Sequence, residues 1–177
     1  LYATRAITPG RAFAPNGEMR SLFDQSFPYR ETRDQLKAIR EIDSDMERPF
    51  PMDRLLVGDV GYGKTEVALR AAVKAVENGL QAAFVAPTTV LAQQHYRTCL
   101  ARIGDLPIRT ALLSRMVTPA GQKKIRTGLA EGTIDLVVGT HSLFRTALEF
   151  KNLGLLILDE EHRFGVAHKE LSLIHIS

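Results

Sequence analysis

The chain alternates short continuous runs of apolar residues with longer stretches in which apolar residues recur every three or four positions. The apolar runs lie at residues 55–57, 81–86, 108–113, 134–138 and 153–158. Short runs of this kind are typical of strands buried on both faces, and the longer spacing is typical of amphipathic helices. Their alternation predicts right-handed βαβ units, and hence an α/β fold with a mostly parallel sheet and helices on both faces.

The helical stretches carry recognisable starts and stops. Thr32 and Thr118 are favourable N-cap residues, and Asn78-Gly79 is typical of a helix end. The predicted helices span residues 18–26, 33–45, 66–78, 88–103 and 119–131. We expect residues 1–26 to form a lead-in or linker helix region, followed by the main domain over residues 27–170.

The stretch from Gly58 to Thr65 fits the phosphate-binding pattern G-x-x-x-x-G-K-[ST], with an apolar strand before it and a helix after it. Glycines let the backbone curl so that N–H groups face phosphate oxygens. Lys64 is expected to neutralise the outer phosphates during catalysis, and the Thr65 hydroxyl to bind Mg²⁺. The expected nucleotide-binding residues here are Gly58, Asp59, Val60, Gly61, Tyr62, Gly63, Lys64, Thr65 and Glu66. A glycine-rich turn with an accidental Lys-Thr is the alternative.

A second chemical cluster follows the last apolar run. In a phosphate-loop enzyme, Asp159 is expected on the Mg²⁺ beside Thr65, and Glu160 is expected to orient or deprotonate the attacking water. Glu161 and His162 would couple the site to whatever lies above it. A solvated acidic turn is the alternative, and the phosphate loop upstream favours the catalytic interpretation.

Adenine recognition has a candidate residue in the first turn of the helix that begins after Thr32. The amide of Gln35 could read the adenine edge with its donor and its acceptor, while Phe27 or Tyr29 offers a flat surface for the base. An exposed helix glutamine beside core aromatics fits the same pattern equally well.

Composition narrows the class of protein. The 177 residues are 45% hydrophobic and 24% charged, which is ordinary for a globular domain, and no apolar run is long enough to span a bilayer. The net charge of +3 tolerates a polyanionic partner without demonstrating one. Cys99 is the single cysteine, so a reduced cytoplasm is expected. Because the first residue is Leu1, we expect the chain to start inside a longer protein.

Four segments together resemble the first motor domain of superfamily 2 helicases and translocases. They are the octet at 58–65, Ala-Pro-Thr-Thr-Val-Leu-Ala-Gln-Gln-His-Tyr at 86–96, Gly-Thr-His at 139–141 and Asp-Glu-Glu-His-Arg-Phe-Gly at 159–165. The bacterial transcription-repair coupling factors are the most similar branch. RecG-type branch-migration helicases come second, because they typically carry Asp-Glu-Gln-His at the last motif. The resemblance covers roughly residues 1–170 and implies a RecA-like phosphate-loop domain that uses ATP and Mg²⁺.

The resemblance also implies roles and partners. Gln35 would sense adenine, with Phe27 nearby. The positions implied on the DNA track, mostly at phosphates, are Thr88, Thr89, Arg115, Thr140 and His141. Helix capping and strand-end turns use the same residue types. The implied activity is ATP-driven translocation on double-stranded DNA, with removal of stalled RNA polymerase and recruitment of excision-repair proteins.

Three other functions stay open at this point. The same motor could reverse replication forks, as in RecG-type enzymes. A nucleotide-dependent binding switch without mechanical work would need the same ATP site. A small-molecule kinase is less favoured, because residues 139–141 and 159–162 would have no purpose in it.

The chain also departs from the family pattern. A motor of this class needs a second RecA-like domain carrying the arginine finger, and the resemblance supplies only the first, so we expect weak ATP–Mg²⁺ binding and little hydrolysis. Residues 171–177, Leu-Ser-Leu-Ile-His-Ile-Ser, do not continue the pattern and look like a translated sequencing adaptor or cloning artefact. We therefore leave these seven residues out of the fold prediction.

Overall fold

The computed structural model describes residues 11–57, 63–141, 148–159 and 172–176. The helices in them are α2 (Glu18–Gln25), α3 (Arg33–Met46), α4 (Lys64–Glu77), α5 (Thr89–Ile103) and α6 (Pro119–Glu131). The strands are β1 (Asp53–Leu56), β2 (Gln81–Ala86), β3 (Thr110–Leu113), β4 (Leu136–Thr140), β5 (Leu153–Asp159) and β6 (Ser172–Ile176). Every predicted strand and helix overlaps an observed one, so the element predictions are confirmed.

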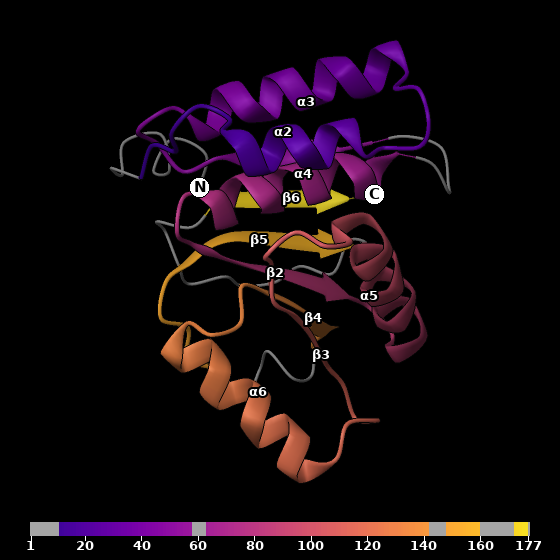
Figure 1. Cartoon of the computed structure of the whole chain (residues 1–177), viewed down its shortest axis with the longest axis vertical. Coiled ribbons are helices and arrows are strands. Elements are labelled where there is room, and N and C mark those ends of the chain that lie inside the picture. Colours follow the sequence, from indigo (N-terminus) through magenta and orange to yellow (C-terminus); the bar gives the residue numbers. More distant parts are fainter. Residues whose placement is uncertain (1–10, 58–62, 142–147, 160–171, 177) are drawn as a thin grey trace.

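The strands form one sheet in the order β1-β6-β5-β2-β4-β3, and all of the described pairs are parallel. The carboxyl ends of the strands therefore share one edge of the sheet. Figure 1 shows the arrowheads of β2, β5 and β6 pointing towards the side where α5 lies. Ligands of parallel sheets collect at this edge, so it is where a site is expected.

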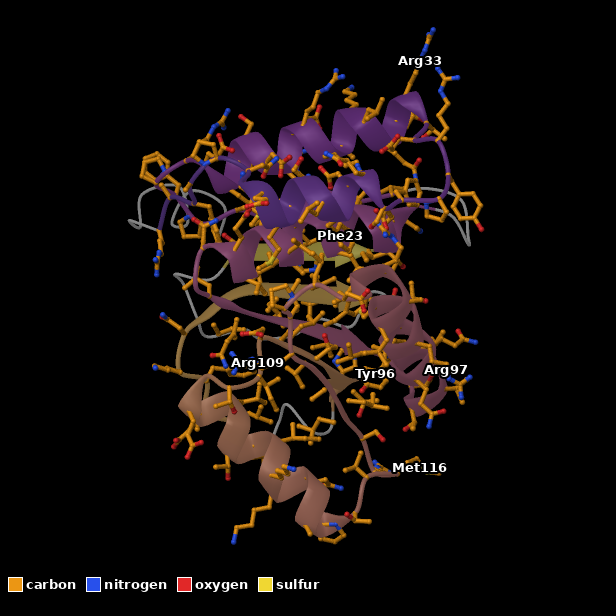
Figure 2. All side chains as sticks on the ribbon, in the orientation of Figure 1. Phe23, Arg33, Tyr96, Arg97, Arg109 and Met116 are labelled. Carbon is orange, nitrogen blue, oxygen red and sulfur yellow. The ribbon has the colours of Figure 1, made fainter. Side chains whose placement is uncertain are left out.

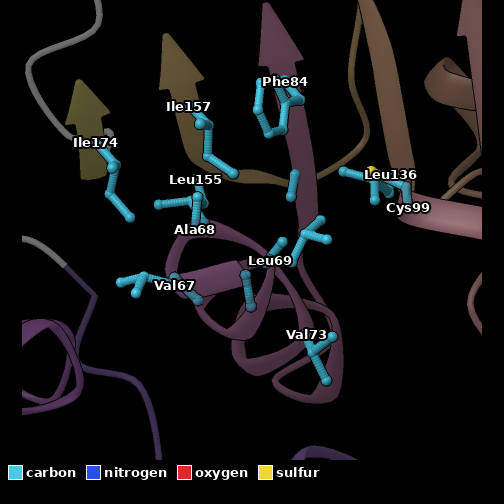
Figure 3. Close-up of a cluster of buried hydrophobic side chains, with 14 of the residues drawn as sticks. Val67, Ala68, Leu69, Val73, Phe84, Cys99, Leu136, Leu155, Ile157 and Ile174 are labelled. Carbon is cyan, nitrogen blue, oxygen red and sulfur yellow. The ribbon is translucent and has the colours of Figure 1, made fainter. Parts of the chain in front are cut away.

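Helices cover both faces of the sheet, as predicted. On β2, Phe84 enters the core shared with α4 and α5, whereas Val85 enters the core shared with Leu129 of α6. Right-handed crossovers explain the division: the chain runs from β1 through β2 to β3 in one direction and returns to β4 in the other. Figure 3 shows the α4 side of this core, where Val67 and Ala68 face Leu155 and Ile157 of β5.

The segment expected to be a lead-in region forms an additional layer of the domain. Figure 1 shows α2 and α3 stacked over α4 at one end of the molecule. Phe13 and Phe23 are buried in the same core as α4. The Arg20 guanidinium, 1% exposed, donates to Asp43 of α3 at 2.8 and 3.0 Å. Residues 11–26 are therefore packed into the main domain, and residues 1–10 lie outside the described part of the chain.

Five of the residues that were left out of the fold prediction, Ser172–Ile176, belong to the sheet. These residues form β6, which pairs with β1 on one side and β5 on the other. Ile174 and Ile176 enter the core beneath α4, and Leu173 enters the opposite core. Apolar residues on both faces are what an inner strand of a parallel sheet requires. These residues do not match the family motifs, but their apolar side chains suit a buried strand.

Candidate nucleotide and metal site

The described part of the phosphate loop is its last turn, where the chain enters α4. Gly63 is the N-cap residue and has a left-handed backbone with φ of +94°, which favours glycine. Its carbonyl accepts from the N–H of Val67 at 3.0 Å, so the helix begins directly after it. Lys64 and Thr65 lie half-buried in this first turn. The positive end of the α4 dipole therefore lies where phosphates are expected. The predicted positions Gly58, Asp59, Val60, Gly61 and Tyr62 lie outside the described residues.

Gln35 lies against the phosphate loop, although it comes from α3. A Cβ atom placed on Gly63 would lie 1.9 Å from Nε2 of Gln35. The oxygen Oε1 accepts from the backbone N–H of Thr32 at 2.8 Å, which closes a capping box at the start of the helix. The amide is thus held with Nε2 directed at the loop. An adenine that used both amide atoms would have to exchange the bond to Thr32.

The two aromatic candidates differ in what they contact. Phe27 packs against the guanidinium groups of Arg70 and Arg102, at 5.2 and 5.3 Å from the ring centre. Tyr29 meets Phe27 edge-on, with ring centres 5.7 Å apart, and is 75% exposed. Tyr29 therefore offers the more open flat surface at this end of the molecule.

Asp159 is the last residue of β5 and lies at the carboxyl edge of the sheet. It is 9% exposed. Side chains alternate along a strand, and Leu155 and Ile157 both enter the core beneath α4, so Asp159 faces the same side. Only β6 separates β5 from β1, whose carboxyl end leads into the phosphate loop. The carboxylate and the start of α4 thus share one edge and one face of the sheet.

This donor set suits magnesium. Mg²⁺ prefers hard oxygen ligands and is usually held by one or two carboxylates together with substrate phosphates. The Asp159 carboxylate and the Thr65 hydroxyl supply that minimum, and within the described ranges no group of three His, Cys, Asp or Glu side chains forms another metal cluster. Glu160, Glu161 and His162 fall outside the described residues.

The Glu66 side chain is held by two arginine residues. It is 8% exposed and accepts from Nε and Nη2 of Arg102 at 2.7 Å each, and from Nε of Arg70 at 3.0 Å. Its carboxylate therefore faces two guanidinium groups, so a contact of Glu66 with a phosphate would have to come from its backbone. Arg70 also donates to Glu31 at 2.9 Å, and this hydrogen bond lowers the pKa of the Glu31 carboxyl.

The residues implied on the DNA track lie along the same edge. Thr88 and Thr89 follow β2, Arg115 follows β3, and Thr140 ends β4 with His141 next to it. Thr88 is exposed, and its hydroxyl accepts from a backbone N–H of the first turn of α5 at 3.2 Å, so it does cap the helix. Arg115 is exposed, whereas Thr140 is only 7% exposed. The structure brings these positions into one row, with different access to solvent.

Figure 2 shows how the far end of this row is arranged. Met116, next to Arg115 and 74% exposed, lies on the same side of the view as Tyr96 and Arg97 of α5. This side is also where the arrowheads of the strands point in Figure 1.

One contact of Asp159 was not predicted from the sequence. Nε2 of His95, on α5, lies 2.5 Å from Oδ2 of Asp159. His95 belongs to the segment that resembles the helicase family, yet no role follows from its position in the sequence. The signal that could have found it is its place on the helix face seven residues after Thr88, since that face looks towards the strand ends.

Comparison with known proteins agrees with this geometry. The DEAD/DEAH box helicase family matches residues 32–176. The transcription-repair-coupling factor of Bacillus subtilis (strain 168) is 56% identical over 96% of this chain, and that of Staphylococcus aureus (strain USA300) is 52% identical over 96%. The chain spans only 14% and 15% of the length of these two relatives. The resemblance inferred from the motifs is confirmed.

Solved structures extend the comparison. The structure of RecG bound to a three-way DNA junction shares 40% identity and a TM-score of 0.91, covering 99% of this chain and 24% of that chain. The helicase MrfA, at 16% identity and a TM-score of 0.66 over 91% of this chain and 29% of that one, shares the fold. In the described part of the chain, no helix is both long and apolar enough to cross a membrane. The chain belongs to the DEAD/DEAH box helicase family.

Proposed function

We propose that this chain is the ATP-binding first motor domain of a double-stranded DNA translocase that removes stalled RNA polymerase and couples transcription to excision repair in the bacterial cytoplasm. The identity of 52–56% to transcription-repair-coupling factors supports the choice of task. The observation that carries the motor assignment is the placement of Asp159 and the start of α4 on the same edge and the same face of the sheet.

This placement supports the following roles for the residues. The backbone of the phosphate loop and Lys64 would hold the phosphates, and Thr65 and Asp159 would hold Mg²⁺, which supplies charge neutralisation when it is bound. Glu160 would orient the attacking water. Gln35 would select adenine through Nε2, which already faces the loop.

Duplex DNA would lie along the row formed by Thr88, Thr89, Arg115, Thr140 and His141. Hydroxyl, backbone and guanidinium contacts to phosphates give affinity without sequence preference, which suits a translocase. RNA polymerase and excision-repair proteins would contact other parts of the longer protein.

A RecG-type fork-reversal motor is the second candidate, favoured by the TM-score of 0.91 to RecG on a three-way DNA junction. An experiment on the parent protein, the longer protein of which this chain would be one domain, distinguishes the two tasks. We expect the parent protein to displace a stalled polymerase from duplex DNA in an ATP-dependent manner and to leave a three-way junction largely unprocessed. The opposite result would assign the chain to the RecG-type task.

A nucleotide-dependent binding switch would share the ATP site without doing mechanical work. Glu160→Gln in the parent distinguishes it, because a motor should trap ATP and stall on DNA, whereas a switch should still cycle its partner. The chain alone should bind ATP–Mg²⁺ weakly and turn it over slowly, since an arginine finger contributes about 10³–10⁵-fold to related reactions. Robust DNA-stimulated turnover in a steady-state ATPase assay of the chain would contradict this expectation.

A further inference from the structure

We propose that His95 is a positioning residue that holds the carboxylate of Asp159 for Mg²⁺ and links that ligand to the DNA row through α5. The inference rests on the proposed function, because it assigns a support to the same metal site. It goes beyond the phosphate-loop and acidic motifs, in which His95 has no part.

The contact is specific and protected from solvent. Nε2 of His95 lies 2.5 Å from Oδ2 of Asp159, and the two side chains are 15% and 13% exposed. The imidazole ring packs on Phe84, which is fully buried, with ring centres 4.4 Å apart and an interplanar angle of 31°. The ring is therefore oriented by Phe84 on its flat side and by the carboxylate at its edge.

The hydrogen bond gives the two oxygens of the Asp159 carboxylate different partners. With Oδ2 of Asp159 engaged by His95, Oδ1 remains to face the metal or its water. Carboxylates that bind metals are commonly oriented by such a second hydrogen bond, and loss of the partner typically costs about 10–100-fold in metal affinity or activity. His95 would act through Asp159 without touching the nucleotide.

The same helix reaches the other half of the site. His95 and Arg102 are seven residues apart, about two turns, so they share one face of α5. Arg102 forms the two 2.7 Å hydrogen bonds to Glu66, the residue next to Thr65. One face of α5 therefore contacts the elements that carry both proposed protein ligands of Mg²⁺.

The proposed link from Asp159 to the DNA row ends at the start of α5. Thr88 caps this helix and lies exposed in the proposed DNA row. Because a helix moves as a rigid unit over such a short length, a displacement of Thr88 by DNA would be transmitted to His95 and hence to Asp159. This gives DNA stimulation of ATP hydrolysis a physical path.

The test compares three variants by the Mg²⁺ dependence of binding of a fluorescent ATP analogue to the chain. His95→Leu keeps the volume and removes the polar edge, His95→Gln retains a donor, and Gln94→Leu alters the exposed neighbouring residue on the same helix. We expect His95→Leu to raise the half-saturating Mg²⁺ concentration by about 10–100-fold. His95→Gln should recover most of that loss, and Gln94→Leu should match the wild type.

Binding of the ATP analogue in excess EDTA is the control. A variant whose fold is damaged would lose this metal-independent binding as well. This binding should be the same in all four proteins, because His95 acts only on the metal ligand. A folded His95→Leu with wild-type Mg²⁺ dependence, or a His95→Gln as impaired as His95→Leu, would overturn the inference while leaving the proposed function intact. A wild-type chain that binds no ATP analogue with Mg²⁺ would instead overturn the proposed function.

The DNA link is tested in the parent protein. We expect His95→Gln to lower the ratio of DNA-stimulated to basal ATP hydrolysis, since its longer, more flexible side chain transmits movement of α5 less well. Thr88→Ala should lower the same ratio without changing the Mg²⁺ dependence. An unchanged ratio in both variants would overturn the link through α5.

Discussion

The two faces of the sheet are packed with different chemistry. On the side of α4 and α5, charged side chains are buried beside the apolar core; those that the structure describes as buried are Arg20, Glu66, Arg70, Lys74 and Asp159. On the side of α6, the core consists of apolar residues from β2, β3, β4, β5 and β6 and from α6 itself. There the buried Gln81 is satisfied by neutral groups, donating to the carbonyls of Leu129 and Ile134 at 2.9 and 2.8 Å.

The difference indicates which face carries function. Burying a charge costs free energy. A protein in which well-packed apolar residues replace a buried ion pair is often as stable or more stable. Yet on the α4 side the ion pairs form a chain that links α2, α3, α4 and α5. Its members, from one end to the other, are Glu47, Lys74, Asp43, Arg20, Asp24, Arg70, Glu66 and Arg102. These contacts hold α4 from several directions, so the helix that presents Lys64 and Thr65 is already in place before a nucleotide arrives.

The largest expected effect comes from Lys64→Ala in the parent protein, which should lower kcat/KM for ATP hydrolysis by about 10²–10³-fold. The estimate follows from the loss of a single preorganised group that stabilises developing negative charge. Lys124→Ala, on the exposed surface of α6, should leave kcat/KM unchanged. Equal losses in a steady-state assay of both variants would show that the two faces do not differ in function.

Glu66→Gln compares the two faces of the sheet by the free energy of unfolding. It leaves the guanidinium groups of Arg70 and Arg102 facing a neutral amide in a buried position, so the free energy of unfolding should fall by about 3–5 kcal/mol. Glu131→Gln, an exposed carboxylate at the end of α6, should stay within about 0.5 kcal/mol of the wild type. Urea denaturation at constant m-value measures both changes. A Glu66→Gln variant as stable as Glu131→Gln would show that the buried ion pairs do not hold α4.

Leu129→Ala tests the apolar face by itself. Leu129 is fully buried, so its truncation should cost about 2–4 kcal/mol of unfolding free energy through lost burial and a cavity. Affinity for the ATP analogue should not change, because α6 lies on the face opposite to α4. Denaturation and a binding titration on the same preparation check the two statements. A weakened affinity in the folded variant would mean that both faces support the nucleotide site.

The smallest expected effect concerns Cys99, which is fully buried in the core between α5 and the sheet. Burial raises the pKa of its thiol from 9.0 to about 12. Since the thiolate is the reactive form, a disulfide reagent at pH 8 should leave the folded chain unlabelled and react only after denaturation. The raised pKa also means that this group's contribution to stability is complete below pH 9 and is lost as the pH rises towards 12. Rapid labelling of the native chain would show that α5 opens readily.

Much of the fold could be predicted from periodicity alone. The run at 81–86 matches β2 residue for residue, and Thr32 and Thr118 cap the helices that they were expected to cap. The strand order could not be predicted, because it depends on which way each crossover turns. The strand at Ser172–Ile176 was missed because its departure from the family pattern was weighed above its apolar character.

The candidate site was predictable to a similar degree. The phosphate loop and Asp159 could be paired in advance, since residues at the carboxyl ends of parallel strands meet at one edge. Gln35 was proposed from its place in a helix, yet its contact with Gly63 depends on how α3 packs over α4. The contact of His95 joins positions 64 residues apart and depends on tertiary packing. The ion pair between Glu66 and Arg102 could not be predicted, because the two residues lie on different helices.

The most direct measurement is a titration of the chain with a fluorescent ATP analogue at increasing Mg²⁺ concentration, comparing the wild type with Asp159→Asn. If Asp159 and the start of α4 meet around one metal-bound nucleotide, Mg²⁺ should tighten binding to the wild type and have almost no effect on the variant, with both proteins equal in EDTA. An Asp159→Asn variant that retains the wild-type response to Mg²⁺ would contradict the account.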